Sequence, residues 1–171
     1  MTAVRRRSED MVSESGKTRK KRIIFVCTGN SCRSPMAEGI ARKIFAEYGL
    51  DYEVDSFGTL DLDGAPPSEF AVEVCRRHGI DISGHRSQQL TRQAAENADL
   101  ILVMENYHRE WILQNLGADL MDKVFLLTEY GGGVPAEIDD PIGSPLTAYE
   151  ETFERIKREI ERIAQHERGD R

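Results

Sequence analysis

The fold is decided by the stretch RIIFVCTGNSCRSPMAE, which occupies residues 22–38. The apolar residues that follow its arginine are typical of a buried β-strand, and residues 35–48 repeat apolar side chains at helical spacing. Residues 27–34 therefore form a loop between a strand and a helix. Ser34 is a good N-cap and Pro35 suits the first helical position, so we expect backbone N–H groups to converge at the positive end of the helix dipole. The sequence predicts a binding site for a phosphoryl group there.

Two residues of this loop carry the chemistry. A helix N-terminus and the guanidinium of Arg33 would favour the thiolate form of Cys27 over the thiol, which would make its sulfur a nucleophile. The planar fork of Arg33 can hold two oxygens of a phosphoryl group at the same centre. Gly29 and Asn30 tolerate the backbone conformations that a tight anion-binding loop needs. The alternative is a buried structural cysteine in a glycine turn, which leaves the positions of Arg33 and the Ser-Pro pair unexplained.

From about Arg22 to Ile163 the chain resembles the low-molecular-weight protein tyrosine phosphatases. The family's loop, Cys-x5-Arg-Ser/Thr, is present in full as CTGNSCRS followed by PMAE, and its late Asp-Pro pair is present as Asp140-Pro141. The segments VDSFGT, HGIDISGHRS, NADLILVM and KVFLLTEYG look like the bacterial branch, which includes protein arginine phosphatases. The resemblance implies a hydrolase that acts on phosphorylated proteins without a cofactor. Inorganic phosphate or another oxyanion would also fit the loop.

The resemblance also assigns roles to the loop and its surroundings. Cys27 would form a cysteinyl-phosphate, and Arg33 would hold the phosphoryl group. Hydrogen bonds from supporting side chains would keep the loop in its anion-binding shape. The phosphate-binding loop comprises Thr28, Gly29, Asn30, Ser31, Cys32 and Ser34, and the supporting residues are Ser56 and His85.

An acid is needed to protonate the leaving group, and the resemblance assigns this role to Asp140. Pro141 restrains Asp140 toward an extended backbone, which suits a carboxylate held over a site. An isolated Asp-Pro is often a plain turn, and Asp139 lies next to it. The three glycines at residues 131–133 would let this loop move, or they would form a simple surface turn.

Strands and helices alternate along the rest of the chain. Strands are expected at residues 52–56, 100–104 and 123–127, and helices at residues 68–78, 105–115 and 146–163. Thr147 and Glu150 predict a capping box for the last helix. The pattern is that of a doubly wound α/β fold, with a four-stranded parallel sheet flanked by helices in a single domain. Ligands bind such sheets beyond the carboxyl ends of the strands, which is where the loop lies.

Charge separates a tail from the domain. Residues 1–22 carry eight Lys/Arg against three Asp/Glu, whereas the remaining residues carry fifteen against twenty-seven. We expect a disordered basic tail at residues 1–21, a phosphatase domain at residues 22–165 and a C-terminal tail at residues 166–171. A solvated arm is favoured over a nucleic-acid or membrane-surface contact for the basic tail, and the acidic domain argues against nucleic acid as a partner.

Composition fits a single cytoplasmic enzyme domain. A chain of 171 residues with 39% hydrophobic residues can bury a core without disulfide or metal staples. Three cysteines do not suggest a secreted disulfide framework, and the sequence has no apolar stretch of about 18 residues that would predict a membrane span. We therefore expect a cytoplasmic location and no membrane partner. The four histidines are dispersed without ligand spacing, so no metal is expected.

The two other cysteines differ in their surroundings. A disulfide between Cys27 and Cys32 would shield the nucleophile from irreversible oxidation, and simple packing of Cys32 is an equal alternative. Cys75 falls among apolar residues of a predicted helix and is expected to be an inert core thiol.

Three functions compete for these residues. A phosphoprotein phosphatase uses all of them; a thiol-dependent arsenate reductase on the same fold would need a relay of further cysteines, and a non-catalytic phosphate-binding module would need no acid. If the protein is a phosphatase, Ser31 and Ile142 bear on which phosphorylated side chain it hydrolyses. Tyrosine-specific members carry a bulky aliphatic residue at the first position and an aromatic residue at the second, whereas phosphoarginine-specific members carry a small threonine at the first. The sequence leans toward phosphoarginine without excluding phosphotyrosine.

Overall fold

The computed structural model describes residues 19–169 and contains one parallel sheet of four strands. The strand order is β2-β1-β3-β4. The strands are β1 (Arg22–Cys27), β2 (Glu53–Gly58), β3 (Leu100–Val103) and β4 (Val124–Leu126). The chain adds β2 on one side of β1 and then β3 on the other. This reversal puts the topological switch point of the sheet at the carboxyl ends of β1 and β3, which is the expected ligand position in such a sheet.

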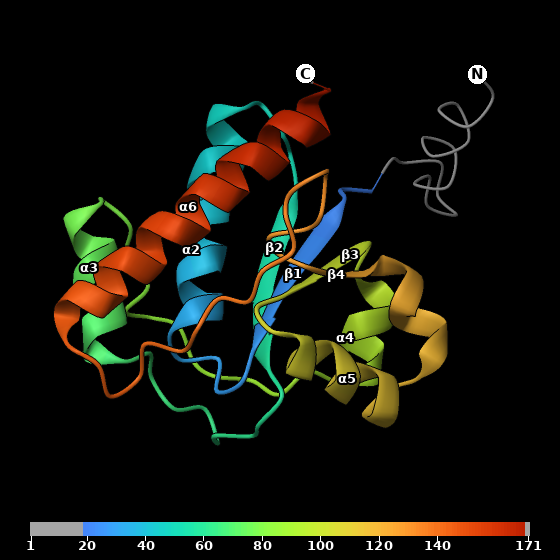
Figure 1. Cartoon of the computed structure of the whole chain (residues 1–171), viewed down its shortest axis with the longest axis horizontal. Helices are drawn as coiled ribbons and strands as arrows, with labels where there is room; N and C mark the ends of the chain where they lie inside the picture. Colours follow the sequence, from blue (N-terminus) through green and yellow to red (C-terminus); the bar gives the residue numbers. More distant parts are fainter. Residues whose placement is uncertain (1–18, 170–171) are drawn as a thin grey trace.

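Helices cover both faces of this sheet (Figure 1). The helices are α2 (Arg33–Glu47), α3 (Glu69–Arg77), α4 (Arg92–Asn97), α5 (Asn106–Asn115) and α6 (Leu146–Arg168), with a 3-10 turn η1 (Ala118–Lys123). Figure 1 shows α2, α3 and α6 on one face and α4 and α5 on the other. The doubly wound, four-stranded parallel α/β fold expected from the sequence is confirmed.

Alternate residues of β1 explain the two layers. Ile23 and Phe25 join the core that contains α2, α3 and α6, whereas Ile24 and Val26 join the core beneath α4 and α5. Because successive strand residues point to opposite faces, a continuous apolar run is the expected sequence of a strand buried on both sides. The first strand is therefore packed on both faces of the sheet, and this fixes the position of the loop that follows it.

Two helix starts differ from the expectation. Helix α2 begins at Arg33 with Cys32 at the N-cap, so Ser34 lies in the first turn and not at the cap. Helix α6 begins at Leu146 after Pro145 and has no side-chain cap, so the capping box predicted from Thr147 and Glu150 is wrong. The N-cap is Pro145, with an extended backbone, so the helix starts two residues earlier than a box at Thr147 requires.

The last helix extends beyond the range expected from the sequence. Helix α6 continues through Arg168, and Glu167 accepts hydrogen bonds from Lys21, Tyr52 and Tyr130. Residues 166–168, which the sequence assigned to a C-terminal tail, are therefore part of α6. Of the predicted tail at residues 1–21, residues 1–18 lie outside the described part of the chain. Within residues 19–169, no helix is both long and apolar enough to cross a membrane.

Candidate active site

The loop at residues 27–34 lies at the carboxyl end of β1, between β1 and α2. Cys27 ends the strand and is 2% exposed. Backbone carbonyls of Cys27, Thr28 and Ser31 accept hydrogen bonds from N–H groups of the segments that follow β2. The first N–H groups of α2 have no carbonyl partner within the helix. The N-terminus of α2 can therefore bind an anion beside the cysteine sulfur.

Two backbone features let the loop turn tightly. Asn30 has φ of +53°, in the left-handed region that asparagine tolerates better than most residues. Gly58, at the end of β2, lies so close to the loop that an added Cβ would be 2.7 Å from the Thr28 carbonyl oxygen. A larger residue at Gly58 would push the loop away from the sheet.

Asn30 is the centre of a buried hydrogen-bond network. Its amide nitrogen donates to Ser34 Oγ at 2.8 Å and to Ser56 Oγ at 3.0 Å. His85 Nε2 lies 3.0 Å from the Asn30 carbonyl oxygen and 3.1 Å from Asn30 Oδ1, so Nε2 carries the hydrogen and donates. Burial lowers the pKa of His85 and keeps the ring neutral near pH 7. The loop residues Asn30 and Ser34 thus lie in one network with Ser56 and His85, the supporting residues that the resemblance implied.

Arg33 links the loop to the segment that carries the aspartates. Its side chain is 1% exposed, and one terminal nitrogen donates to the Ile138 carbonyl oxygen at 2.7 Å. The other terminal nitrogen lies 3.5 Å from Asp140 Oδ2. Among the described residues the Nε of Arg33 has no hydrogen-bond partner, so this buried donor is available to an oxyanion in the loop.

Asp140 is the aspartate whose carboxylate faces Arg33. Its other oxygen, Oδ1, accepts from the backbone N–H of Ile142 at 3.1 Å, and its side chain is 37% exposed. The carboxylate is thus held near the loop and is still open to solvent. The glycines at residues 131–133 form a packed turn, because a Cβ on Gly133 would lie 2.0 Å from the Thr128 carbonyl oxygen. The turn interpretation fits these glycines better than a free hinge.

Three residues near the loop were not identified from the sequence. Glu105 lies 3.3 Å from Arg33, His108 Nε2 lies 2.9 Å from Thr28 Oγ1, and Glu38 Oε1 accepts from Ser56 Oγ at 3.0 Å. The available signal for Glu105 was its position directly after the strand at residues 100–104. The other two contacts depend on helix orientation, which periodicity alone does not give.

The three cysteines are free thiols. Cys32 is buried, and its sulfur lies 3.3 Å from Ser68 Oγ and 3.7 Å from the Tyr149 hydroxyl. Cys75 is fully buried, and burial raises the pKa of its thiol to about 12. Cys75 is therefore the inert core thiol expected from the sequence.

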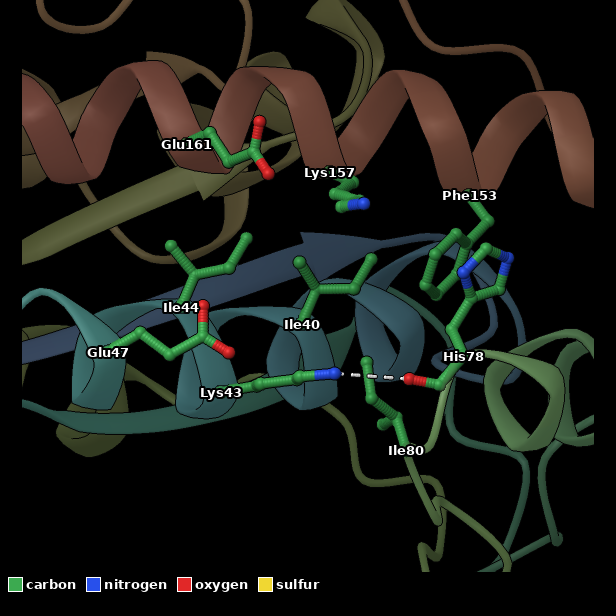
Figure 2. Close-up of a pocket in the computed structure, with 9 residues that line it drawn as sticks. All are labelled: Ile40, Lys43, Ile44, Glu47, His78, Ile80, Phe153, Lys157 and Glu161. Atoms are coloured by element: carbon green, nitrogen blue, oxygen red, sulfur yellow. Dashed lines mark hydrogen bonds between the residues drawn. The ribbon is translucent and has the colours of Figure 1, made fainter.

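Away from the loop, a cavity of about 200 Å³ lies between α2 and α6 (Figure 2). Ile40, Ile44, Ile80 and Phe153 form its apolar lining, and Lys43 Nζ donates to the His78 carbonyl oxygen at 3.2 Å. None of the predicted site residues lines this cavity. In the described part of the chain, no group of three or more His, Cys, Asp or Glu side chains could hold a metal ion.

Comparisons with known proteins agree with this geometry. Residues 22–169 match the family model described as low molecular weight phosphotyrosine protein phosphatase. A protein-arginine-phosphatase of Bacillus subtilis is 36% identical over 149 residues, covering 87% of this chain and 98% of the relative. A probable low molecular weight protein-tyrosine-phosphatase, EpsP, of Ralstonia nicotianae is 42% identical over 141 residues, covering 82% and 92%.

A solved structure shows the same fold. The YwlE arginine phosphatase, in a mutant with a phosphorylated active-site serine, has a TM-score of 0.81 and 35% identity and covers 88% of this chain and 97% of its own. The chain belongs to the low molecular weight phosphotyrosine protein phosphatase family. It is a cysteine-dependent protein phosphatase, a hydrolase of phosphotyrosine or phosphoarginine in proteins. The arsenate reductase alternative is not favoured by these relatives.

Proposed function

We propose that this phosphatase prefers phosphoarginine and works through a cysteinyl-phosphate on Cys27. In the first step the thiolate attacks phosphorus, the bond to the leaving nitrogen or oxygen breaks, and Asp140 gives that atom its proton. In the second step water attacks the cysteinyl-phosphate, Asp140 takes the proton of the water, and the Cys27 thiolate leaves with inorganic phosphate as the product. The atoms and charges balance without any cofactor.

The observation that carries this mechanism is the position of Arg33. Its buried guanidinium lies within 3.5 Å of the Asp140 carboxylate and extends from the residue that begins α2. A planar cation at this position can hold phosphoryl oxygens between the nucleophile at the end of β1 and the acid on the later loop. Ser34 Oγ lies 2.9 Å from the Cys27 sulfur and can stabilise the thiolate.

The substrate preference is proposed from two residues, Ser31 in the loop and Ile142 after the Asp-Pro pair. Ser31 is small and half-buried, and its hydroxyl would lie 3.3 Å from a Cβ on Gly29. Ile142 is 61% exposed and offers no aromatic ring for stacking on a phenyl group. These features suit a guanidinium better than a phenol. The relatives named as arginine phosphatases support the same choice. Those named as tyrosine phosphatases make a preference for phosphotyrosine the alternative.

The cellular location of the protein and the extent of its domain are also proposals. The free state of all three cysteines supports a cytoplasmic location. The hydrogen bonds of Glu167 support a domain that runs from Arg22 through Arg168.

The test compares matched peptides that carry phosphoarginine, phosphotyrosine or phosphoserine. We expect kcat/KM to be highest for phosphoarginine and poor for phosphoserine, because a short side chain does not carry its phosphate to the bottom of the loop. Cys27→Ser should abolish turnover without unfolding the protein, and Arg33→Lys should lower it severely because a point charge cannot replace a two-pronged donor. Turnover by Cys27→Ser would end the mechanism. A strong preference of the wild type for phosphotyrosine would overturn only the substrate choice.

A further inference from the structure

A second set of contacts reaches the loop from the first turn of α5, separate from the network around Asn30. His108 is 0% exposed, and its Nε2 lies 2.9 Å from the hydroxyl oxygen of Thr28. The carboxylate of Glu105 lies 3.3 Å from a terminal nitrogen of Arg33. The N-cap residue of α5, Glu105, and His108, three residues later, thus contact the two ends of the loop.

The hydrogen-bond pattern fixes the tautomer of His108. The backbone N–H of Glu105 lies 3.1 Å from Nδ1 of His108, and because an amide N–H can only donate, Nδ1 must accept. Burial, together with the nearby Arg33 cation, lowers the pKa of His108 to about 3. The ring is therefore neutral at working pH and carries its hydrogen on Nε2. It donates to Thr28 while it accepts from Glu105.

We propose that His108 is a positioning residue of the active site. Through Nε2 it holds Thr28, the residue next to the nucleophile, and through Nδ1 it holds the backbone from which Glu105 contacts Arg33. Nucleophile and phosphate-binding arginine would then be fixed relative to one another by a single imidazole. This inference rests on the proposed function of the loop as the phosphate site.

Another histidine provides the comparison. His78 stacks on Phe153 with ring centroids 4.1 Å apart, and it lines the cavity shown in Figure 2. Its ring nitrogen lies 3.3 Å from Glu150, on α6. His78 is thus a packed histidine outside the loop, whereas both ring nitrogens of His108 are used by the loop or by the residue that contacts Arg33. A substitution at His78 is the matched control.

The experiment uses substitutions that separate the two ring nitrogens. His108→Asn keeps an acceptor near the position of Nδ1 but is too short to reach Thr28, whereas His108→Gln can place an amide donor near the position of Nε2. Thr28→Val removes the hydroxyl and keeps the branched shape. We expect kcat/KM per folded molecule to fall by about 2- to 12-fold in His108→Asn and in Thr28→Val, the range for one lost hydrogen bond.

Two further readouts distinguish positioning from packing. The inhibition constant of orthophosphate should rise in parallel with the loss of kcat/KM, and His108→Gln should recover part of both. The double variant Thr28→Val/His108→Asn should be no worse than the poorer single variant, because both changes remove the same bond. His78→Gln should leave kcat/KM unchanged. If His108→Asn fails to fold, Thr28→Val and His108→Gln still supply the test.

Additive effects in the double variant would overturn the proposal. So would variants with wild-type kcat/KM and orthophosphate inhibition that lose only thermal stability, which is the behaviour of an ordinary core histidine. Failure of the proposed function is detected separately, since it would appear as turnover by Cys27→Ser. In that case orthophosphate binding would still report the coupling between Thr28 and His108.

Discussion

The hydroxyl oxygen of Ser34 lies 2.9 Å from the sulfur of Cys27 and accepts a hydrogen bond from the Asn30 amide at 2.8 Å. Because Asn30 is the donor in that second bond, the hydrogen of Ser34 is left for the sulfur or for the Phe57 carbonyl oxygen at 3.3 Å. A thiolate accepts hydrogen bonds better than a thiol does. Ser34 can therefore turn its hydrogen to Cys27 whenever the sulfur is charged, both before attack and as the thiolate leaves the phosphoenzyme.

Removal of this hydroxyl should slow the step in which the thiolate departs. We expect Ser34→Ala to lower kcat by about 10- to 150-fold, the range for a hydrogen bond to a charged group. Rapid-quench experiments should then show more phosphate held on Cys27 at steady state than in the wild type. Ser83→Ala, which removes an exposed hydroxyl bonded to Asp81, is the control. Equal phosphoenzyme levels in Ser34→Ala and the wild type would contradict the role.

Substitutions of the two neighbouring aspartates should have clearly different effects on kcat. Asp140→Ala should lower kcat by roughly 10²–10⁴-fold, the usual span for general acid catalysis, with smaller losses on substrates whose leaving groups need little protonation. Asp139→Ala should remain near the wild type because the contact with Arg33 is made by Asp140. A larger loss in Asp139→Ala would show that the wrong carboxylate has been assigned.

Glu38 should make stability depend on pH. Its carboxylate accepts from Ser56 and pairs with Arg42 at 3.1 Å, but burial dominates and raises its pKa to about 7 from an ordinary value of 4.5. Between these values the folded protein binds more protons than the unfolded chain, so this group lowers stability as pH rises from about 4.5 to 7. We expect Glu38→Gln to reduce this decline in urea midpoints measured across the same pH range.

The exposed residue Glu47, on the same helix, provides the control. Glu47→Gln should follow the wild-type pH profile. If Glu38→Gln and the wild type lost stability in parallel between pH 4.5 and pH 7, then Glu38 would not be the titrating group.

The sequence was sufficient to predict the structure where consecutive elements lie next to one another along the chain. A strand, a loop and a helix follow one another within residues 22–38, so periodicity correctly predicted the order of the elements. The loop residue types predicted an anion site, which stays a prediction. Ser34 shows the limit of this reasoning. Its type suited an N-cap, but in the structure its hydroxyl contacts the Cys27 sulfur, and the helix starts two residues earlier, with Cys32 at the N-cap. Tertiary contacts with the nucleophile took precedence over local capping.

Contacts between distant segments were the part that the sequence did not predict. Val26 pairs with Val103 in the sheet, and this register brings the segment after β3 beside the loop after β1. Only in this arrangement does Glu105 contact Arg33 and His108 contact Thr28. His108 carries no local signal for such a bond, since its role depends on which face of α5 is buried. The long reach of α6 was missed because Glu167 is polar and gains its partners only in the fold.

Cys32 gives a test of redox protection. Its buried sulfur contacts Ser68, and α2 begins at the next residue, so a bond to Cys27 requires the first turn of α2 to loosen. We expect peroxide to inactivate the enzyme and reductant to restore the wild type much more fully than Cys32→Ser. Phosphate should protect both proteins by occupying the loop. Equal recovery of the two proteins would make Cys32 a packing residue.

Ser31 should decide which phosphorylated side chain reaches the loop. Its small hydroxyl leaves room for a planar guanidinium, whereas an isoleucine would fill that room with apolar volume suited to a phenyl ring. We expect Ser31→Ile to lower kcat/KM for a phosphoarginine peptide while sparing or improving it for the matched phosphotyrosine peptide, since specificity is the ratio of these values. Ser31→Thr keeps the hydroxyl and nearly the same size, so it should retain the wild-type preference. If Ser31→Ile left the ratio unchanged in a wild type that already prefers phosphotyrosine, both the selector role of Ser31 and the proposed arginine preference would be wrong.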